Sequence, residues 1–558
     1  MKSTIRNIVN IPVKRMSAML VAALAICSCN DWLSEPQPAK PLLEEFFVAG
    51  GGDAAVQAVN AAYVPLQWEY GATYCPEWWI GDVASDDALK GGQNISDMAA
   101  AYELDNFKVS DNNPILLDWY QLNFHGVARC NFVLEQLPAV APDSAMDART
   151  KKRLMAEASF LRALYYFRLV RVFGEMPLVT FTIQTSEKWR QPKASVEDIY
   201  AQIFRDLESA NAGLWAASEL NPADVGRATK GAAQAMLLKA HLYCAQRSSE
   251  HYAAARLWGD SIIASGEYSL EDRYADNFSI YHENGNESVF EVQYGEEPSS
   301  DYGSFNPHFG GTRGTFTTIL TRSRSSQVPK TVSGGTTDGW GFNKPTQDLY
   351  DEFEEGDARR SASILALSSA QMSTPTEEIY LGSPYLTRKY AIMDDDLNAL
   401  WNGHATRAPI NIKLIRYADV LLMYAEACNE SGDFATARNT LNELRAQRRT
   451  ECTDPATQLP DFPNYANRKT GSAYTDDPNG LREAIRHERR VELALESHRW
   501  FDLVRWGIAA ATMNAYKSRE TPEVQAAMND FTEGKSEYFP LPQYELDLSG
   551  LEQNEKWK

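Results

Sequence analysis

The sequence lacks the short motifs that identify most enzymes and metal-binding proteins. It contains no His-Glu-x-x-His metal motif, no Gly-rich phosphate loop and no Gly-x-Ser-x-Gly nucleophile turn. Cysteine is scarce, and five remain beyond Cys29: Cys75, Cys130, Cys244, Cys428 and Cys452. No pair of them has the close spacing of a zinc site, and an odd number cannot all pair. We therefore expect no disulfide framework, and Cys244 and Cys428 fall within helical apolar patterns as core residues.

Positive charge is in deficit, with 54 Lys and Arg against 75 Asp and Glu and a formal net charge of −21. The first 28 residues hold four cations and no anion, so the rest of the chain carries −25. This net negative charge disfavours binding to nucleic acid and to anionic lipid headgroups. No later stretch approaches the 18 or more consecutive apolar residues of a membrane helix. Any membrane attachment is therefore expected to be through lipid.

The N-terminus has the organisation of a lipoprotein export signal over residues 1–28. Four cations precede an apolar run from Met16 to Ile26, which is followed by Cys27, Ser28 and Cys29. A branched aliphatic residue at −3 and a small residue at −1 predict Cys29 as the acylated first residue. Cys27 fits less well as the acylated residue, because the large residue Ile26 would then occupy position −1 of the cleavage site. The alternative is an ordinary secretory signal. Multiple acylation of Cys29, with palmitate among the chains, would give the two or more chains that stable anchoring needs.

Helical hairpins recur in the middle and near the end of the chain. In the first, apolar residues stripe a helix over 233–244, a Ser-Ser-Glu turn follows, and a second helix ends at Gly266. In the second, a stripe over 417–428 leads through Gly432 and Asp433 into a partner helix that starts at Phe434. These patterns are typical of tetratricopeptide hairpins. They predict a mainly α fold in which stacked hairpins form a solenoid-like scaffold with minor β structure.

Further helices are expected at 53–68, 112–137, 150–173, 195–216 and 480–506. Two stretches, 70–111 and 267–345, lack helical periodicity, and both are rich in aromatic residues and glycine. A long irregular stretch in a compact protein is usually a binding surface or disordered, and the aromatic content argues against disorder. Residues 288–294 predict a short strand. We divide the chain into the signal 1–28, an N-terminal helical region 29–266 and a C-terminal region 267–558, in which 267–345 is an irregular insertion.

Five segments resemble the SusD/RagB family of surface glycan-binding lipoproteins. They are Cys29–Leu33 with Glu35 and Pro36, Ala158–Phe167 running on to Pro177, Ile415–Ala427, Glu488–Leu493 with Arg499–Gly507, and Phe539–Pro542 leading to Trp557. They span the chain in the family's order. Ser497 departs from the family pattern, which usually has glycine there, and we expect no functional consequence from it.

The resemblance implies a helical scaffold with tetratricopeptide-like hairpins and a loop-rich face that captures ligand. Family members are lipid-anchored in the outer membrane, facing the exterior, as lids over a TonB-dependent SusC-like transporter to which they deliver oligosaccharide. The acidic start after Cys29 is similar to the sequence that accompanies display on the outer face. No enzymatic activity and no cofactor are expected.

Sugars present one face of C–H groups and a rim of hydroxyls, so aromatic rings and polar side chains are the expected ligand contacts. Composition of the two irregular stretches, rather than a transferable motif, predicts the ligand-binding residues, which are Trp79, Asp86, Asp87, Tyr102, Tyr281, Tyr302, Phe305 and Trp340. Each also has a structural alternative. One member of the pair Trp78 and Trp79 normally packs inside, Trp340 could simply fix its loop, and the two aspartates are more typical of caps.

Two acidic patterns suggest chemistry but favour structural roles. Glu488 and Glu492 lie on the apolar stripe of one helix amid Arg489, Arg490 and Arg499, which indicates a partly buried ion network rather than a catalytic pair. Asp394–Asp396 is a run of carboxylates without the alternating ligands of a calcium loop, so a solvated turn is expected.

Three functions remain open at this point. The leading hypothesis is capture of oligosaccharides for the transporter. The second is capture of oligopeptides, which would favour grooves that bond peptide backbones over stacking aromatics. The third is a surface glycoside hydrolase, which needs only two carboxylates.

Overall fold

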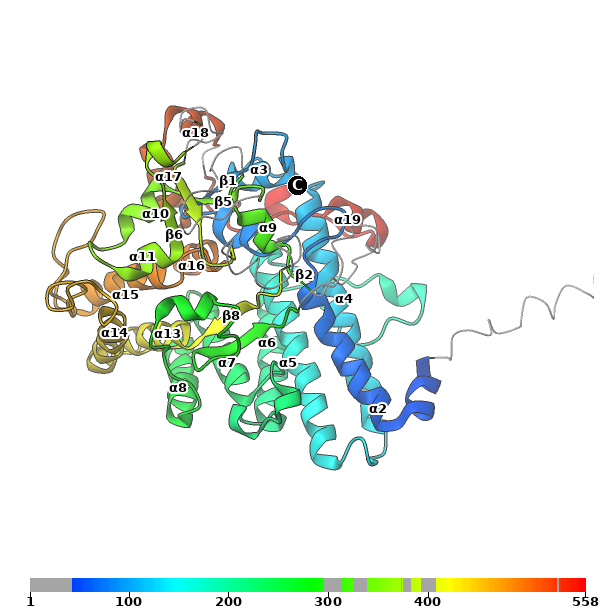
Figure 1. Cartoon of the computed structure of the whole chain (residues 1–558). Coiled ribbons are helices and arrows are strands. Elements are labelled where there is room, and N and C mark those ends of the chain that lie inside the picture. Colours follow the sequence, from blue (N-terminus) through cyan, green and yellow to red (C-terminus); the bar gives the residue numbers. More distant parts are fainter. Residues whose placement is uncertain are drawn as a thin grey trace, which may run out of the picture.

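Antiparallel helices packed side by side form the scaffold of this protein (Figure 1). The computed structural model describes residues 43–295, 314–324, 339–372, 374, 383–392, 408–528 and 531–558. The long helices are α2 (Leu43–Tyr63), α4 (Pro114–Gln136), α5 (Ala148–Phe173), α6 (Val196–Gly213), α7 (Lys230–Cys244), α8 (Glu250–Ser265), α13 (Tyr417–Glu430), α14 (Phe434–Arg449) and α15 (Pro478–Glu492).

Each long helix packs on the next one in a continuous row. The contacts run from α2 to α4, α5, α6, α7 and α8, and from α8 to α13, which also packs on α14 and α15. Such a row buries a core between successive neighbours instead of around one centre. The solenoid-like architecture and both predicted hairpins, α7 with α8 and α13 with α14, are confirmed.

Side-chain caps explain where several of these helices begin. Asn113 accepts the backbone N–H groups of Ile115 and Leu116 at the start of α4, where Pro114 occupies the first turn. Asp147 and Asp433 accept an N–H in the same way at α5 and α14. A cap of this kind satisfies a backbone donor that has no partner within the helix and is worth about 1 kcal/mol.

The rest of the described chain consists of loops, short helices and two-stranded antiparallel sheets. The strand pairs are β1 (Ala88–Gly91) with β5 (Phe342–Pro345), β2 (Met176–Pro177) with β3 (Lys193–Ala194), β4 (Ser288–Val292) with β8 (Ile412–Arg416), and β6 (Ile364–Ala366) with β7 (Tyr385–Thr387). The short helices are α3 (Ala99–Asp105), α9 (Thr317–Thr321), α10 (Gln347–Glu352), α11 (Ala358–Ser363), α16 (Arg499–Arg505), α17 (Ala509–Arg519), α18 (Pro522–Ala527) and α19 (Gln543–Ser549).

Most expected elements appear within a few residues of their predicted bounds, including the strand at 288–292. The helix expected over 480–506 is different, because it stops at Glu492 and resumes as α16 at Arg499. In between, Leu495 and Ser497 have φ of 61° and 66°, a left-handed conformation that glycine adopts at the least steric cost. The Ser497 N–H donates to the carboxylate of Asp82 at 2.8 Å, which holds the break in place.

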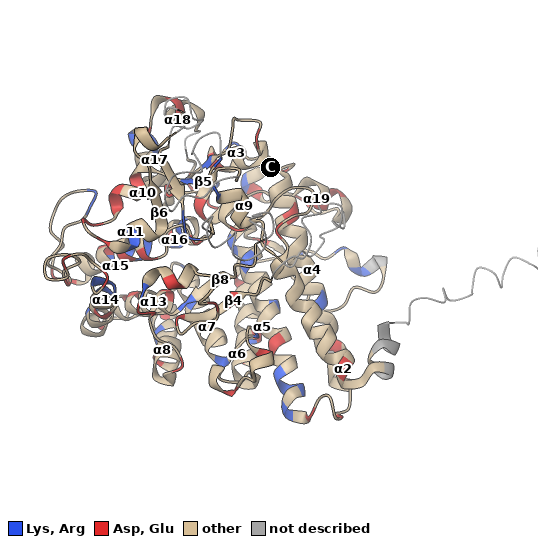
Figure 2. Cartoon of the chain, in the orientation of Figure 1, with Lys and Arg blue, Asp and Glu red and all other residues tan. Residues whose placement is uncertain are grey.

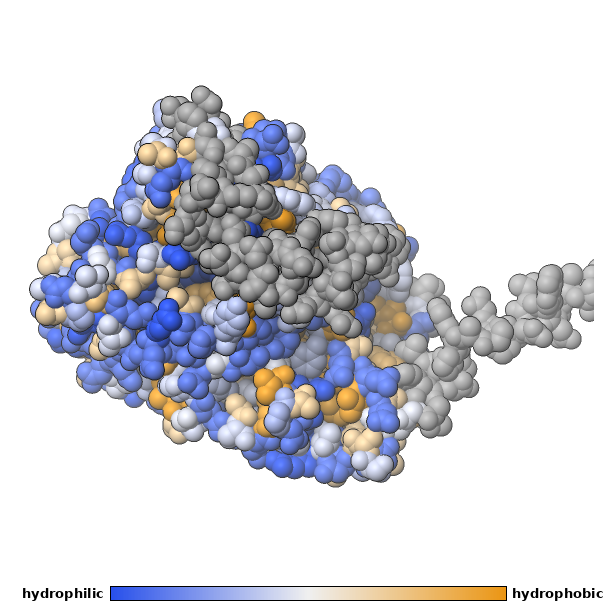
Figure 3. Space-filling view, viewed as in Figure 1, coloured by the Kyte–Doolittle hydropathy of each residue, from blue (hydrophilic) through white to orange (hydrophobic). Residues whose placement is uncertain are grey.

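Burial of Cys244 and Cys428 agrees with their predicted core role. Cys75, Cys130, Cys244, Cys428 and Cys452 are all buried and free. The largest apolar cluster draws residues from both the N-terminal and the C-terminal region, from Ala62 to Leu546. None of the helices in the described part of the chain is long and apolar enough to cross a membrane. Hydrophilic residues dominate the face seen in Figure 3, with apolar residues in small patches.

Charged residues are concentrated where α10, α11 and α14–α16 meet (Figure 2). Glu488 pairs with Arg359 and Arg445, and Glu492 pairs with Arg359, Arg416 and Arg448, all of them at most 2% exposed. The predicted ion network is therefore present. Its partners differ from the expected Arg489, Arg490 and Arg499, and it is fully rather than partly buried.

Candidate ligand-binding site

Four aromatic rings from three loops form a cluster beside the N-terminal end of the helical row. Tyr74 lies at its centre, with ring centroids 4.8 Å from Tyr70, 5.3 Å from Phe316 and 5.2 Å from Trp340. Phe316 is buried, whereas Tyr70, Tyr74 and Trp340 keep part of their surface exposed. We call these four residues the aromatic platform.

A buried carboxylate fixes two of the three loops to each other. Glu69 accepts hydrogen bonds from the hydroxyls of Thr315 and Thr317, at 2.7 and 2.8 Å, and from the backbone N–H of Phe316 at 2.6 Å. Burial raises the pKa of Glu69, and these three donors act in the opposite direction. A buried carboxylate is stable only when its oxygens are paired in this way. Glu69 therefore clamps Tyr70 and Phe316 into one surface.

The turn that carries Tyr70 and Tyr74 is held by helix α4. Tyr70 and Tyr74 form an antiparallel bridge, and Asp118 on α4 accepts the N–H groups of Ala72 at 3.1 Å and Thr73 at 2.8 Å. Burial raises the pKa of Asp118 to about 6 despite these two hydrogen bonds. The turn is thus attached to the most regular part of the scaffold, which restricts the motion of its tyrosines.

Trp340 is positioned by its backbone and by a glycine. Its N–H donates to the carbonyl of Ile319 at 2.9 Å, and its ring meets Tyr74 edge to face at 84°. A Cβ atom at Gly339 would lie 2.2 Å from the carbonyl oxygen of Arg322, so only glycine allows this close approach. Gly339 and Trp340 are therefore held closely against residues 319–322.

The platform combines apolar faces with hydrogen-bonding groups nearby. Thr73 donates to the Met98 sulfur, and the neighbouring Asp97 pairs with Arg324, which follows α9. Aromatic faces cover the C–H face of a sugar, and carboxylate and guanidinium groups bond its hydroxyls. The arrangement suits the binding of a sugar, which requires neither a nucleophile nor an acid with a shifted pKa.

The structure places three of the predicted ligand-binding residues inside the protein. Trp79 is 0% exposed and packs between Trp78 and Phe342, with centroids at 4.1 and 5.3 Å. Asp86 and Asp87 are also buried and pair with Arg490 and Arg499. These three positions are corrected from ligand contacts to internal packing and ion pairing, because none of them presents surface to a ligand. The expected capping role of the two aspartates is replaced by these ion pairs.

The remaining predicted residues fall in different places. Trp340 belongs to the aromatic platform, Tyr102 on α3 is half-buried, and Tyr281 is 61% exposed on the loop before β4. Tyr302, Phe305, the lipidation candidate Cys29 and Asp394–Asp396 lie outside the described residues. Sequence reasoning missed Tyr70, Tyr74 and Phe316. Tyr70 and Tyr74 flank a Gly-Ala-Thr turn and could have been found together, whereas nothing local identifies Phe316.

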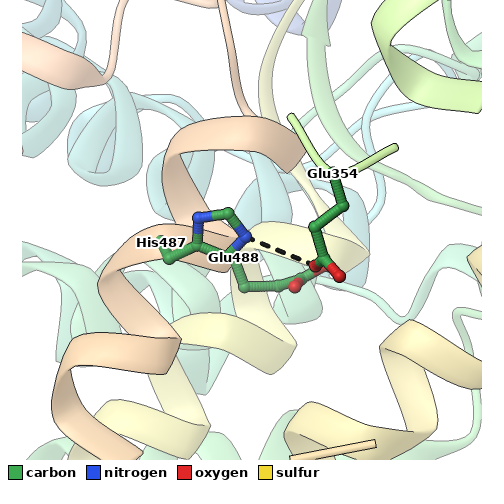
Figure 4. Close-up of side chains that lie close together, drawn as sticks. All are labelled: Glu354, His487 and Glu488. Carbon is green, nitrogen blue, oxygen red and sulfur yellow. Dashed lines mark ion pairs between the residues drawn. The ribbon is translucent and has the colours of Figure 1, made fainter. Parts of the chain in front are cut away.

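A second cluster, of Glu354, His487 and Glu488, has the composition of a metal site (Figure 4). Its charges are already paired, since both glutamates contact Arg445 and His487 contacts Glu352 at 2.8 Å and Glu354 at 3.5 Å. Burial lowers the pKa of His487, but Glu352 and Glu354 outweigh it and raise this pKa to about 9. Because each of the three side chains already has oppositely charged partners, we interpret the cluster as a structural ion network.

Comparison with known proteins identifies similar sequences and folds. The SusD family model matches residues 369–557, and a model for starch-binding proteins that associate with the outer membrane matches residues 71–242. SusD-like protein P25 of Formosa agariphila is 26% identical over 442 residues, which are 75% of this chain and 74% of that protein. The starch-binding protein SusD of Bacteroides thetaiotaomicron is 25% identical over 437 residues, 70% of each chain.

Solved structures extend the similarity over nearly the whole chain. A laminarin-binding SusD-like protein is 28% identical with a TM-score of 0.74, covering 90% of this chain and 98% of its own. Surface glycan-binding protein A from Bacteroides fluxus is 25% identical with a TM-score of 0.73 and the same coverage. These relatives are named as binding proteins and not as enzymes.

Proposed function

This chain belongs to the SusD family of outer-membrane-associated proteins, and on that premise we propose that it captures oligosaccharides at the cell surface and delivers them to a TonB-dependent SusC-like transporter. The observation that carries glycan capture is the aromatic platform, in which Tyr70, Tyr74 and Trp340 are partly exposed on a rigid support. The glycan-binding relatives support the same ligand class.

Rigidity is what makes the platform suitable for a sugar ligand. Glu69 and Asp118 fix the loops through five hydrogen bonds, so little conformational entropy is lost when a sugar binds. Tyr102, Tyr281, Tyr302 and Phe305 remain proposed contacts outside the platform. Binding without catalysis is proposed, because the platform is built from aromatic rings and not from a carboxylate pair.

Affinity electrophoresis against a polysaccharide panel tests glycan capture, with laminarin as the first probe. We expect at least one glycan to retard the wild-type protein. Trp340→Ala should lower the affinity for that glycan by at least about 10-fold, which is about 1.4 kcal/mol. Trp189→Ala is the matched control, because Trp189 is 62% exposed and lies outside the platform. Equal retardation of Trp340→Ala and wild type would contradict the site. Release of reducing sugar by the purified protein would indicate a hydrolase instead.

The proposed anchor is acylated Cys29, which would hold the acidic protein at the outer membrane, facing the exterior. Metabolic labelling with palmitate should mark the wild-type protein and not Cys29→Ala, and protease added to intact cells should degrade the wild-type protein. An unlabelled wild-type protein, or one protected in intact cells, would contradict the anchor or its orientation.

A further inference from the structure

An apolar groove lies along α4, the helix whose Asp118 holds the turn that carries Tyr70 and Tyr74. Its volume is about 600 Å³, and it is bounded by α4, by the segment 177–191 and by α19. Among the described residues eight large apolar side chains are exposed, and four of them line this groove: Ile183, Trp189, Tyr544 and Leu548. Concentrated exposure of this kind marks a site that another molecule covers.

Two polar side chains of the groove are already used within the protein, whereas the Thr182 hydroxyl has no hydrogen-bond partner among the described residues. Gln121 donates to Glu545 at 2.7 Å, and Asn131 donates to the carbonyls of Val179 and Phe181 and accepts from Arg162. The surface left for an occupant is therefore mainly aliphatic and aromatic. An occupant that presents apolar protein side chains therefore suits the groove.

The position of the groove points to a partner at the membrane. The described chain begins at Leu43, and the ring of Phe47 lies 5.2 Å from Phe132 on α4, next to groove residue Asn131. Only 14 residues separate Leu43 from Cys29, and fully extended they span at most about 50 Å. A lipid on Cys29 would thus keep Leu43, where α2 begins, within about 50 Å of the membrane, in reach of proteins embedded in it.

The groove also lies close to the platform along the same helix. Asp118, which holds the turn of the platform, precedes the groove residues Gln121 and Phe124 by three and six positions on α4. At 1.5 Å per residue this is a displacement of roughly 5–9 Å along the helix axis. A protein seated in the groove would border the platform, which suits transfer of a bound glycan.

We propose that this groove docks an apolar segment of the outer-membrane transporter, through Trp189, Leu548 and their neighbours. The inference rests on the proposed function for the identity of the partner. It adds the surface through which the two proteins associate.

The test compares two charge-introducing double variants of the full chain. Trp189→Glu with Leu548→Glu places two carboxylates in the groove, and both residues are exposed enough for the fold to tolerate the change. Val225→Glu with Leu257→Glu is the matched control, at residues that are 52% and 66% exposed outside the groove. Each tagged protein is purified from detergent-solubilised outer membranes of its native host, and the co-purified TonB-dependent transporter is quantified by mass spectrometry.

We expect the wild type and the control to recover the transporter and the groove variant to recover at least about 10-fold less. Equal recovery by the groove variant, or no recovery by the wild type, would overturn the proposal. Concentration-dependent dimers in light scattering that only the groove variant loses would instead assign the groove to a second copy of the chain.

Glycan affinity, measured by calorimetry on the same proteins, separates this inference from the proposed function. All three proteins should bind the retarding glycan equally. If the groove variant loses glycan affinity, the groove is a sugar site and the docking proposal is wrong. If none of them binds a glycan, the proposed function fails, whatever the transporter recovery shows.

Discussion

Individual charged and small residues in the core determine how the loops join the scaffold. Asp86 is 0% exposed and is paired by Arg499 at 2.7 Å and by Arg490 at 3.1 Å. Burial raises the pKa of Asp86, but the two guanidinium groups outweigh this and hold it well below its usual value. These pairs join the segment after Trp79 to α15 and α16, which are about 400 residues away in the sequence.

Removing this carboxylate should be costly, because it leaves two buried cations with less compensation. We expect Asp86→Ala to lower the free energy of unfolding by about 3–5 kcal/mol. Glu219→Ala is the control, since Glu219 pairs with Arg149 on the surface and its loss should cost less than about 1 kcal/mol. Urea unfolding of both variants measures the difference. Equal stability of the two variants would contradict the assigned role.

Gly81 lies where a loop approaches the backbone of a distant segment too closely for a larger residue. A Cβ atom at Gly81 would lie 2.4 Å from the backbone of Ser497, at the break between α15 and α16. We expect Gly81→Ala to lower the free energy of unfolding by about 1–3 kcal/mol through overpacking. Gly295→Ala should change it by less than about 0.5 kcal/mol, because a Cβ there meets no atom within 4 Å. Thermal unfolding measures both variants. An equal change in Tm for Gly81→Ala and Gly295→Ala would contradict the role of the close contact at Gly81.

At the scale of elements, buried ion pairs join α15 to the loops packed against it. His487 on α15 contacts Glu352 at the end of α10 and Glu354 just beyond it. Its folded-state pKa of about 9 exceeds the value of about 6.5 expected in the unfolded chain. The contribution of His487 to stability is therefore complete below pH 6.5 and is lost as the pH rises through 9.

The pH dependence of unfolding tests this attachment. Between pH 6.5 and 9 the wild-type protein should lose up to about 3 kcal/mol of stability through His487, since each pKa unit is worth 1.36 kcal/mol. His487→Gln should be less stable at pH 6.5 and show a flatter dependence over this interval. His282→Gln, at an exposed histidine, should follow the wild type. A wild-type slope retained in His487→Gln would contradict the assignment.

The elements differ in how far the sequence predicts them. Helical hairpins were predictable because their apolar spacing and their caps are local, as Asp433 before α14 illustrates. The break at Leu493–His498 was not, because it depends on the distant carboxylate of Asp82. Trp340 of the candidate platform was among the residues predicted from the composition of the stretch 267–345. Glu69 and Phe316 were not, since the clamp joins residues 246–248 positions apart and no local pattern signals it.

At the scale of the whole molecule, the row of helices supports one loop-rich region that carries the platform (Figure 1). Helix α4 connects the two surfaces discussed above, because Asp118 holds the platform turn and Gln121 and Phe124 line the apolar groove. We propose that the sugar binds the aromatic rings on the fixed loops and that the transporter contacts the apolar surface beside them. Capture and delivery would thus use neighbouring parts of one rigid body.

The most direct test of this account is a crystal structure of the protein with the oligosaccharide that retards it in affinity electrophoresis. The account predicts a sugar ring in contact with Trp340 and Tyr74, with its hydroxyls bonded to polar groups of the surrounding loops. A sugar bound elsewhere, with Tyr70, Tyr74 and Trp340 untouched, would contradict it.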